Sequence, residues 1–164
     1  MKTKIISILG HSPGPGAYKE SKNSKNPDLG SSNIADKEHY IRINVKPYWV
    51  GFFKNDFHVK LATSISKHTD DYEFECWRPY LGCDKIYSKK IDGITQRVFP
   101  AKKLKVPFVN LEYSNLMINK LNDYIDNKKI IVHLQGYHDQ ALDYLLLKSK
   151  LDRVPVLATQ RGMV

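Results

Sequence analysis

Short apolar segments rich in β-branched residues are the feature that most constrains the fold of this chain. Lys4–Leu9, Ile130–Leu134 and Val154–Ala158 are five or six residues long and nearly continuously apolar. Such runs are typical of strands buried on both faces in a parallel sheet. Segments with helical periodicity separate them, and the order strand–helix–strand–helix–strand predicts an α/β fold with right-handed crossovers.

The remaining segments complete this pattern. Apolar residues recur at spacings of three and four from Tyr48 to His68, and this stripe predicts a helix. Further helices are expected from Leu111 to Asn127 and from Ala141 to Lys150, and strands at His39–Val45 and Tyr72–Trp77. Lys85–Phe99 is predicted to be a β-hairpin that turns at Asp92–Gly93. Residues 10–36 are rich in Gly, Pro, Ser and Asn and are expected to form a long flexible loop.

Length and composition favour one globular domain over residues 1–164. Hydrophobic residues make up 41% of the chain and charged residues 26%, which excludes general disorder. The apolar runs are far shorter than the ~20 residues that a membrane-spanning helix needs.

The net charge of +9 comes from 26 basic and 17 acidic residues, and the basic ones are mostly lysines spread along the chain. The densest group is Lys102, Lys103 and Lys105. Three interpretations are open: a solvated surface, attraction to lipid headgroups or a phosphorylated ligand, and nucleic-acid binding. The last is the least supported, because nucleic-acid readers usually cluster arginines with aromatic residues.

Cysteine usage and the amino terminus predict a cytoplasmic protein. Cys76 and Cys83 are separated by six residues, which fits neither a redox CxxC motif nor zinc-ligand spacing. The apolar stretch behind Met1–Lys4 is too short for a secretory signal.

Polar residues follow three of the predicted strands, where ligands bind in open parallel sheets. Gly14 and Gly16 lie in the first segment, and their backbone can approach a ligand closely. The alternative is a simple exit from strand to loop. The segment matches neither GxGxxG nor the Walker motif, so no dinucleotide or P-loop site is predicted.

The other two segments carry side chains that can bind oxygen atoms. His133 lies at the tip of the second strand, Gln135, Gly136 and His138 follow it, and Gln160, Arg161 and Gly162 follow the third. Imidazole can bond a sugar hydroxyl, and arginine can hold a phosphate or carboxylate. A structural histidine and a surface arginine are the alternatives. The spacing of the two histidines does not match a metal pair, so no metal site is predicted.

No nucleophilic triad can be assembled from the sequence. Glu73 and Glu75 share one face of an alternating strand, which fits either a general acid–base pair or a solvated face. Cys76 is expected to be buried near Trp77.

In the order of these elements the chain resembles the amino-terminal, acceptor-side half of GT-B glycosyltransferases of the retaining, GT4-like type. The resembling segments are the strand that leads into Gly14–Gly16, the helix with Phe57–Ala62, the strand Tyr72–Arg78, the Asp92–Gly93 hairpin, Ile130–Gly136 and Val154–Gly162. The resemblance implies a Rossmann-like, mostly parallel sheet with flanking helices. It also implies transfer of a sugar from a nucleotide-sugar donor to a saccharide or lipid-linked acceptor.

The resemblance assigns roles to individual residues. Gly14 and Gly16 would lie near the acceptor and the donor phosphate, and His133 would contact the donor sugar as the catalytic residue. Gln135 stands where many relatives have the second His of His-x-His-Gly, and Arg161 where they often have the His of Thr-x-His-Gly. The resemblance implies no cofactor and no metal, and Asp-x-Asp is absent.

The donor-nucleotide domain of such enzymes, with its Glu-x7-Glu motif, is not found in residues 1–164. This half alone is therefore expected to be inactive, because the nucleotide would lack its pocket. The resemblance also implies peripheral contact with the inner face of the membrane, through the lysine group and Trp49, Phe52 and Phe53, for which core packing is the alternative. The rival hypothesis is a non-catalytic α/β binding or interaction domain.

Overall fold

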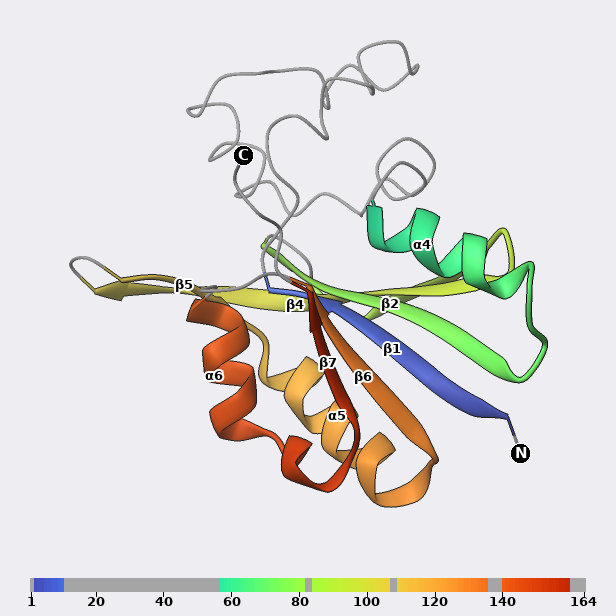
Figure 1. Ribbon diagram of the computed structural model, residues 1–164. Coiled ribbons are helices and arrows are strands. Elements are labelled where there is room, and N and C mark those ends of the chain that lie inside the picture. Colours follow the sequence, from blue (N-terminus) through green and yellow to red (C-terminus); the bar gives the residue numbers. More distant parts are fainter. Residues whose placement is uncertain (1, 11–56, 82–83, 107–108, 136–139, 160–164) are drawn as a thin grey trace, which may run out of the picture.

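Parallel strands form the centre of the structure (Figure 1). The computed structural model describes residues 2–10, 57–81, 84–106, 109–135 and 140–159. The parallel strands are, in spatial order, β4 (Ile94–Val106), β2 (Tyr72–Leu81), β1 (Thr3–Leu9), β6 (Ile130–Gln135) and β7 (Val156–Thr159). β3 (Tyr87–Ile91) and β5 (Val109–Tyr113) pair with β4 in the antiparallel direction. The prediction of an α/β fold with a Rossmann-like, mostly parallel sheet is confirmed.

Helices cover both faces of this sheet. On one face lies α4 (Phe57–Ser66), and on the other lie α5 (Asn115–Asn127) and α6 (Gln140–Lys148), as Figure 1 shows. A short 3₁₀ turn, η3 (Leu151–Arg153), joins α6 to β7. The helix α5 begins where the Ser114 side chain accepts a hydrogen bond from the Met117 amide, which satisfies one of the free donors of the first turn.

The alternation of side chains along each strand divides the core into two layers. Ile6, Ile8 and Trp77 face α5 and α6, where Leu121 and Leu145 are fully covered. The Trp77 ring lies 4.9 Å from the ring of Phe99 and 5.4 Å from that of Tyr124, measured between centroids. Such aromatic pairs add about 0.5–1.5 kcal/mol each beyond area burial.

The second layer lies under α4. Phe74, Cys76 and Ile94 pack there against Val59 and Ala62 of the helix. Both faces of β2 are thus buried. Successive residues of this strand, which point to opposite faces of the sheet, therefore all lie in the interior from Phe74 to Tyr80.

The predicted hairpin is confirmed. β3 and β4 are joined by Asp92 with φ 50° and Gly93 with φ 83°. Positive φ at both central residues matches the right-handed twist of a two-stranded ribbon, and Asp-Gly is a favoured pair for it.

One predicted helix boundary is wrong. Leu111 was expected in the second helix, but it lies in β5 opposite Leu104 of β4. The reason is the Ser114 cap, which starts α5 three residues later, so that Leu111 is buried from a strand instead. β4 also continues well past the expected end at Phe99, to Val106.

The other predicted elements within the described residues are confirmed with small shifts. β7 begins at Val156 because Val154 ends η3. Lys4–Leu9, Tyr72–Trp77, Ile130–Leu134 and the helix after Ala141 correspond to β1, β2, β6 and α6. The predicted helix after Tyr48 is described only from Phe57, and the predicted loop beyond Gly10 and the strand His39–Val45 lie outside the described residues.

Candidate functional site

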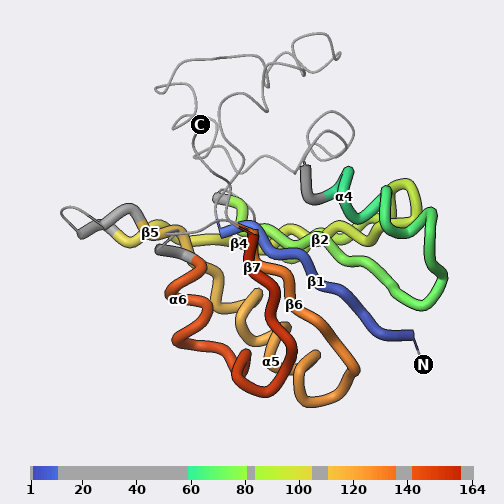
Figure 2. The backbone as a smooth tube through the Cα atoms, in the orientation of Figure 1, coloured from blue at the N-terminus to red at the C-terminus, as the bar shows by residue number. Residues whose placement is uncertain are grey.

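The candidate site lies where the strand order changes direction. From β1 the chain builds the sheet outward through β2 and β4, and it then returns to place β6 and β7 on the other side of β1. Figure 2 shows β1, β6 and β7 side by side. In open α/β sheets of this order, the carboxyl ends of the two strands at the change of direction border the ligand crevice. The candidate site is therefore at the ends of β1 and β6.

A row of polar side chains crosses the sheet near this point, on the face that α4 partly covers. Ser7 of β1 is in register with His133 of β6 on one side and with Cys76 of β2 on the other, and Cys76 is in register with Gln96 of β4. In-register residues of parallel strands point to the same face. All four side chains are buried, and three of them, Ser7, His133 and Gln96, are polar, which is unusual for the interior of a sheet face.

Hydrogen bonds connect the row to the end of the sheet. His133 Nδ1 lies 3.2 Å from Ser7 Oγ, and His133 Nε2 lies 3.1 Å from Thr159 Oγ1 of β7. Gln135 Nε2 donates to Ser7 Oγ at 3.4 Å. Each ring nitrogen of His133 thus lies within hydrogen-bond distance of a hydroxyl group. Thr159 is the exposed end of this series of hydrogen bonds.

The imidazole of His133 is set up as a neutral hydrogen-bonding group. It is 8% exposed, and burial lowers its pKa below the usual 6.5. The thiol of Cys76 is also uncharged and is therefore a poor nucleophile. Burial, together with the Glu75 carboxylate, raises the pKa of this thiol to about 12.

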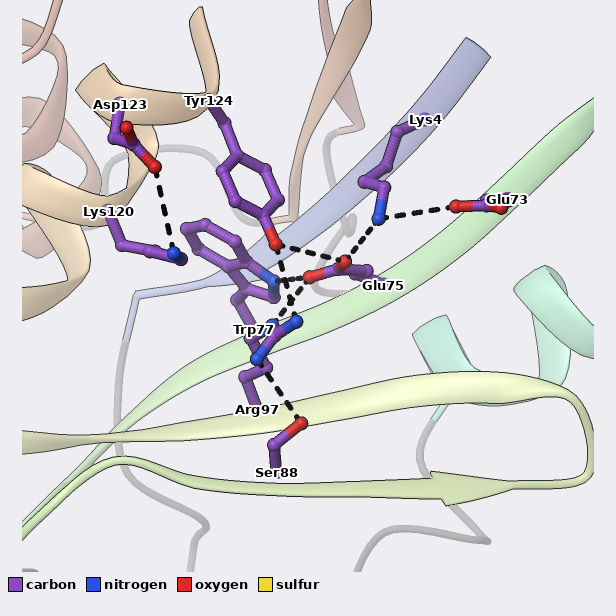
Figure 3. A network of polar contacts seen from close by, with 9 residues as sticks. All are labelled: Lys4, Glu73, Glu75, Trp77, Ser88, Arg97, Lys120, Asp123 and Tyr124. Atoms are coloured by element: carbon purple, nitrogen blue, oxygen red, sulfur yellow. Dashed lines mark hydrogen bonds and ion pairs between the residues drawn. The ribbon is translucent and has the colours of Figure 1, made fainter. Parts of the chain in front are cut away.

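A second polar cluster lies on the opposite face of the sheet, beside α5 (Figure 3). Its centre is Glu75, which is 2% exposed. The carboxylate is 2.7 Å from Lys4 Nζ and 2.7 Å from Arg97 Nε, and it accepts a hydrogen bond from Trp77 Nε1 at 2.8 Å. The Tyr124 hydroxyl completes the cluster with a contact of 3.4 Å.

These contacts determine the charge of Glu75. Burial alone would raise the pKa of the carboxyl, but hydrogen bonds from Arg97, Lys4 and Trp77 outweigh it, and the pKa is lowered. Glu75 is therefore ionised at neutral pH and cannot serve as a general acid. Neither hypothesis for the Glu73–Glu75 face describes Glu75, since the residue is buried and its carboxylate is bound by Lys4, Arg97 and Trp77. Its role is to hold β1, β2, β4 and α5 together.

The structure brings together two of the residues predicted for the site, His133 and Gln135, through their shared partner Ser7. The other predicted site residues are Gly14, Gly16, Gly136, His138, Gln160, Arg161 and Gly162, and they lie outside the described residues. Sequence reasoning did not assign Ser7 or Thr159. The available signal for Ser7 was its position as the single hydroxyl inside the apolar run of β1.

Within the described ranges, no group of three or more His, Cys, Asp or Glu side chains is arranged to hold a metal ion. Likewise, no helix in that part of the chain is long and apolar enough to span a membrane.

The fold and the site together define an α/β protein of Rossmann-like type with linked polar side chains at its change of strand direction. Comparison with family models, curated proteins and solved structures gives no match to this chain.

Proposed function

We propose that this chain is the acceptor-side domain of a glycosyltransferase, which transfers a sugar from a nucleotide-sugar donor to a saccharide or lipid-linked acceptor. One observation carries the proposal: the chain of neutral hydrogen-bonding groups formed by Ser7, His133, Gln135 and Thr159 lies at the change of strand direction. Uncharged hydroxyl, imidazole and amide groups suit the recognition of sugar hydroxyls, which both donate and accept hydrogen bonds.

The roles within the proposed reaction follow from burial. His133 would act through hydrogen bonding, because its ring is neutral and enclosed. Its task would be to orient the sugar rather than to carry a proton, and orientation of bound reactants is itself a large source of rate enhancement. The donor nucleotide would bind to a second domain facing this edge.

Exposed lysines support a lipid-linked acceptor. Lys102 and Lys103 are exposed where β4 extends beyond β2 to pair with β5. Such exposed positive side chains would attract a lipid pyrophosphate or an anionic membrane surface.

The rival function is a binding domain without catalysis. It is favoured by the absence of a charged nucleophile from the described part of this edge, where the Cys76 thiol is buried and protonated. In that case the same crevice would bind a saccharide and release it unchanged.

The test is transfer by the full-length natural protein, measured as nucleotide release from a panel of nucleotide-sugars. His133→Asn keeps a group able to bond Ser7 but cannot reach Thr159, and we expect it to lower the rate at least about tenfold through loss of this hydrogen bond. His68→Ala is the matched control, because His68 is exposed in the turn after α4. Saccharide binding without nucleotide release from any donor would favour the rival function.

A further inference from the structure

The hydrogen bonds around His133 take one direction when every buried polar hydrogen is given an acceptor. A serine hydroxyl has a single proton to donate. Ser7 Oγ accepts from the Gln135 amide, and the Ser7 hydroxyl is buried. Among its hydrogen-bond partners in the described residues, His133 Nδ1 is the group that can accept the Ser7 proton, and a buried hydroxyl proton needs an acceptor. Because Nδ1 then accepts, a neutral His133 carries its proton on Nε2.

The same reasoning extends to the exposed end. His133 Nε2–H donates to Thr159 Oγ1 across 3.1 Å. Among the described residues, Thr159 Oγ1 has no other hydrogen-bond partner, and its own proton is left to donate outward. Each bond in such a chain polarises the next, so the last hydroxyl is a stronger donor than an isolated one.

We propose that the Thr159 hydroxyl is the terminal donor of a one-way chain from Gln135 through Ser7 and His133, and that it binds an acceptor oxygen of the ligand. The inference rests on the proposed function for the nature of that ligand. The oxygen belongs either to a phosphate or to a sugar, and both offer the same lone-pair chemistry. Thr159 is then a binding residue, and Ser7 and His133 are positioning residues that act through it.

The direction of the chain is tested first, on the free protein. Nitrogen-15 NMR of the imidazole distinguishes the two neutral tautomers, and His133→Asn assigns the signals. We expect Nε2 to be protonated and Nδ1 unprotonated at pH 7. Gln135→Met removes the first donor at similar side-chain volume, and the Nδ1-protonated form should then become populated. A wild-type ring protonated on Nδ1 or on both nitrogens, or a tautomer unchanged in Gln135→Met, overturns the proposed direction.

The contact with the ligand is tested by titration with two probes, inorganic phosphate and methyl α-glucoside. Loss of one hydrogen bond predicts that Thr159→Val weakens binding of the recognised probe roughly three- to tenfold, while Thr159→Ser restores it. Ser7→Ala should weaken it by a smaller factor, because it removes only the polarisation behind Thr159. Thr63→Val is the control, since that hydroxyl bonds the Val59 carbonyl within α4.

The two probes distinguish the two sources of the oxygen. If Thr159→Val weakens only the binding of phosphate, Thr159 binds an oxygen of the donor phosphate. If it weakens only the binding of the glucoside, Thr159 binds an oxygen of the sugar. Equal affinity of wild type and Thr159→Val, or no binding of either probe to the wild-type protein, overturns the contact. The tautomer result does not depend on transfer activity. A fixed Nε2–H tautomer with probe binding but no transfer would refute the glycosyltransferase and keep the binding role of Thr159.

Discussion

Replacing Glu75 with Gln removes a negative charge that four elements of the fold share. The carboxylate is 2% exposed and lies 2.7 Å from both Lys4 Nζ and Arg97 Nε. Removing one partner of a buried ion pair costs about 3–5 kcal/mol, because the remaining charge is left without compensation. The Lys4 and Arg97 side chains are 16% and 22% exposed and can regain some water. We therefore expect Glu75→Gln to lower the free energy of unfolding by about 3 kcal/mol.

Urea unfolding followed by tryptophan fluorescence measures this loss. For a chain of this length the corresponding fall in Tm is roughly 6–12 °C. The matched control is Glu73→Gln, since Glu73 also pairs with Lys4, at 3.2 Å, but its side chain is 58% exposed. Such a pair contributes at most about 1 kcal/mol. If the two variants differ by less than about 1 kcal/mol, the central role of Glu75 is refuted.

The pH dependence provides an independent check. The folded-state pKa of Glu75 is lower than the usual 4.5, so its contribution to stability is present above pH 4.5 and is lost as the pH falls below it. The free energy of unfolding of wild type should therefore decline more steeply with acid below that pH than that of Glu75→Gln. Parallel pH profiles would contradict the assignment.

Three further outcomes are expected. Gln96→Met should raise the free energy of unfolding by about 1 kcal/mol, because both polar atoms of this buried amide are unpaired in the described structure. Urea titration measures the change, and a loss of stability would mean that the amide has a partner. Gly93→Ala should cost about 1–2 kcal/mol from its φ of 83° alone, since nothing lies within 4 Å of an added Cβ, and a thermal melt equal to wild type would contradict this. The His133 ring should titrate below pH 6.5 by NMR, so that its burial makes the protein less stable as the pH falls through 6.5, and a higher pKa would disprove the enclosed, neutral imidazole.

Local patterns along the chain were sufficient for most of the described fold. Nearly continuous apolar runs indicated β1 and β6 because strands covered on both faces carry mostly apolar residues at successive positions. The Asp92–Gly93 turn could be predicted from the sequence because few residue pairs tolerate positive φ at two successive positions. β5 was not predicted because it is a strand by virtue of its pairing with β4, which the local sequence does not show. Leu111 alone fits a helix or a strand equally well.

The candidate site was only half predictable for a similar reason. His133 and Gln135 stand out as polar residues at the end of an apolar strand. Their connection through Ser7 depends on a register between strands that are more than 120 residues apart in sequence, with separations of 126 and 128. Nothing local to Ser7 shows which residues lie beside it.

The class of fold and the strand ends at which to look for a site could be predicted from the amino-acid pattern, because both depend on periodicity and on the polarity of individual residues. Which polar side chains lie together depends on how the strands and helices pack. Glu75 was expected on a solvated face or in an acid–base pair. It is instead the buried centre of an ion cluster, because β1, β4 and α5 bring Lys4, Arg97 and Tyr124 against it. Thr159 became the exposed end of a hydrogen-bond chain because β7 pairs with β6 in the register that places its hydroxyl at His133 Nε2.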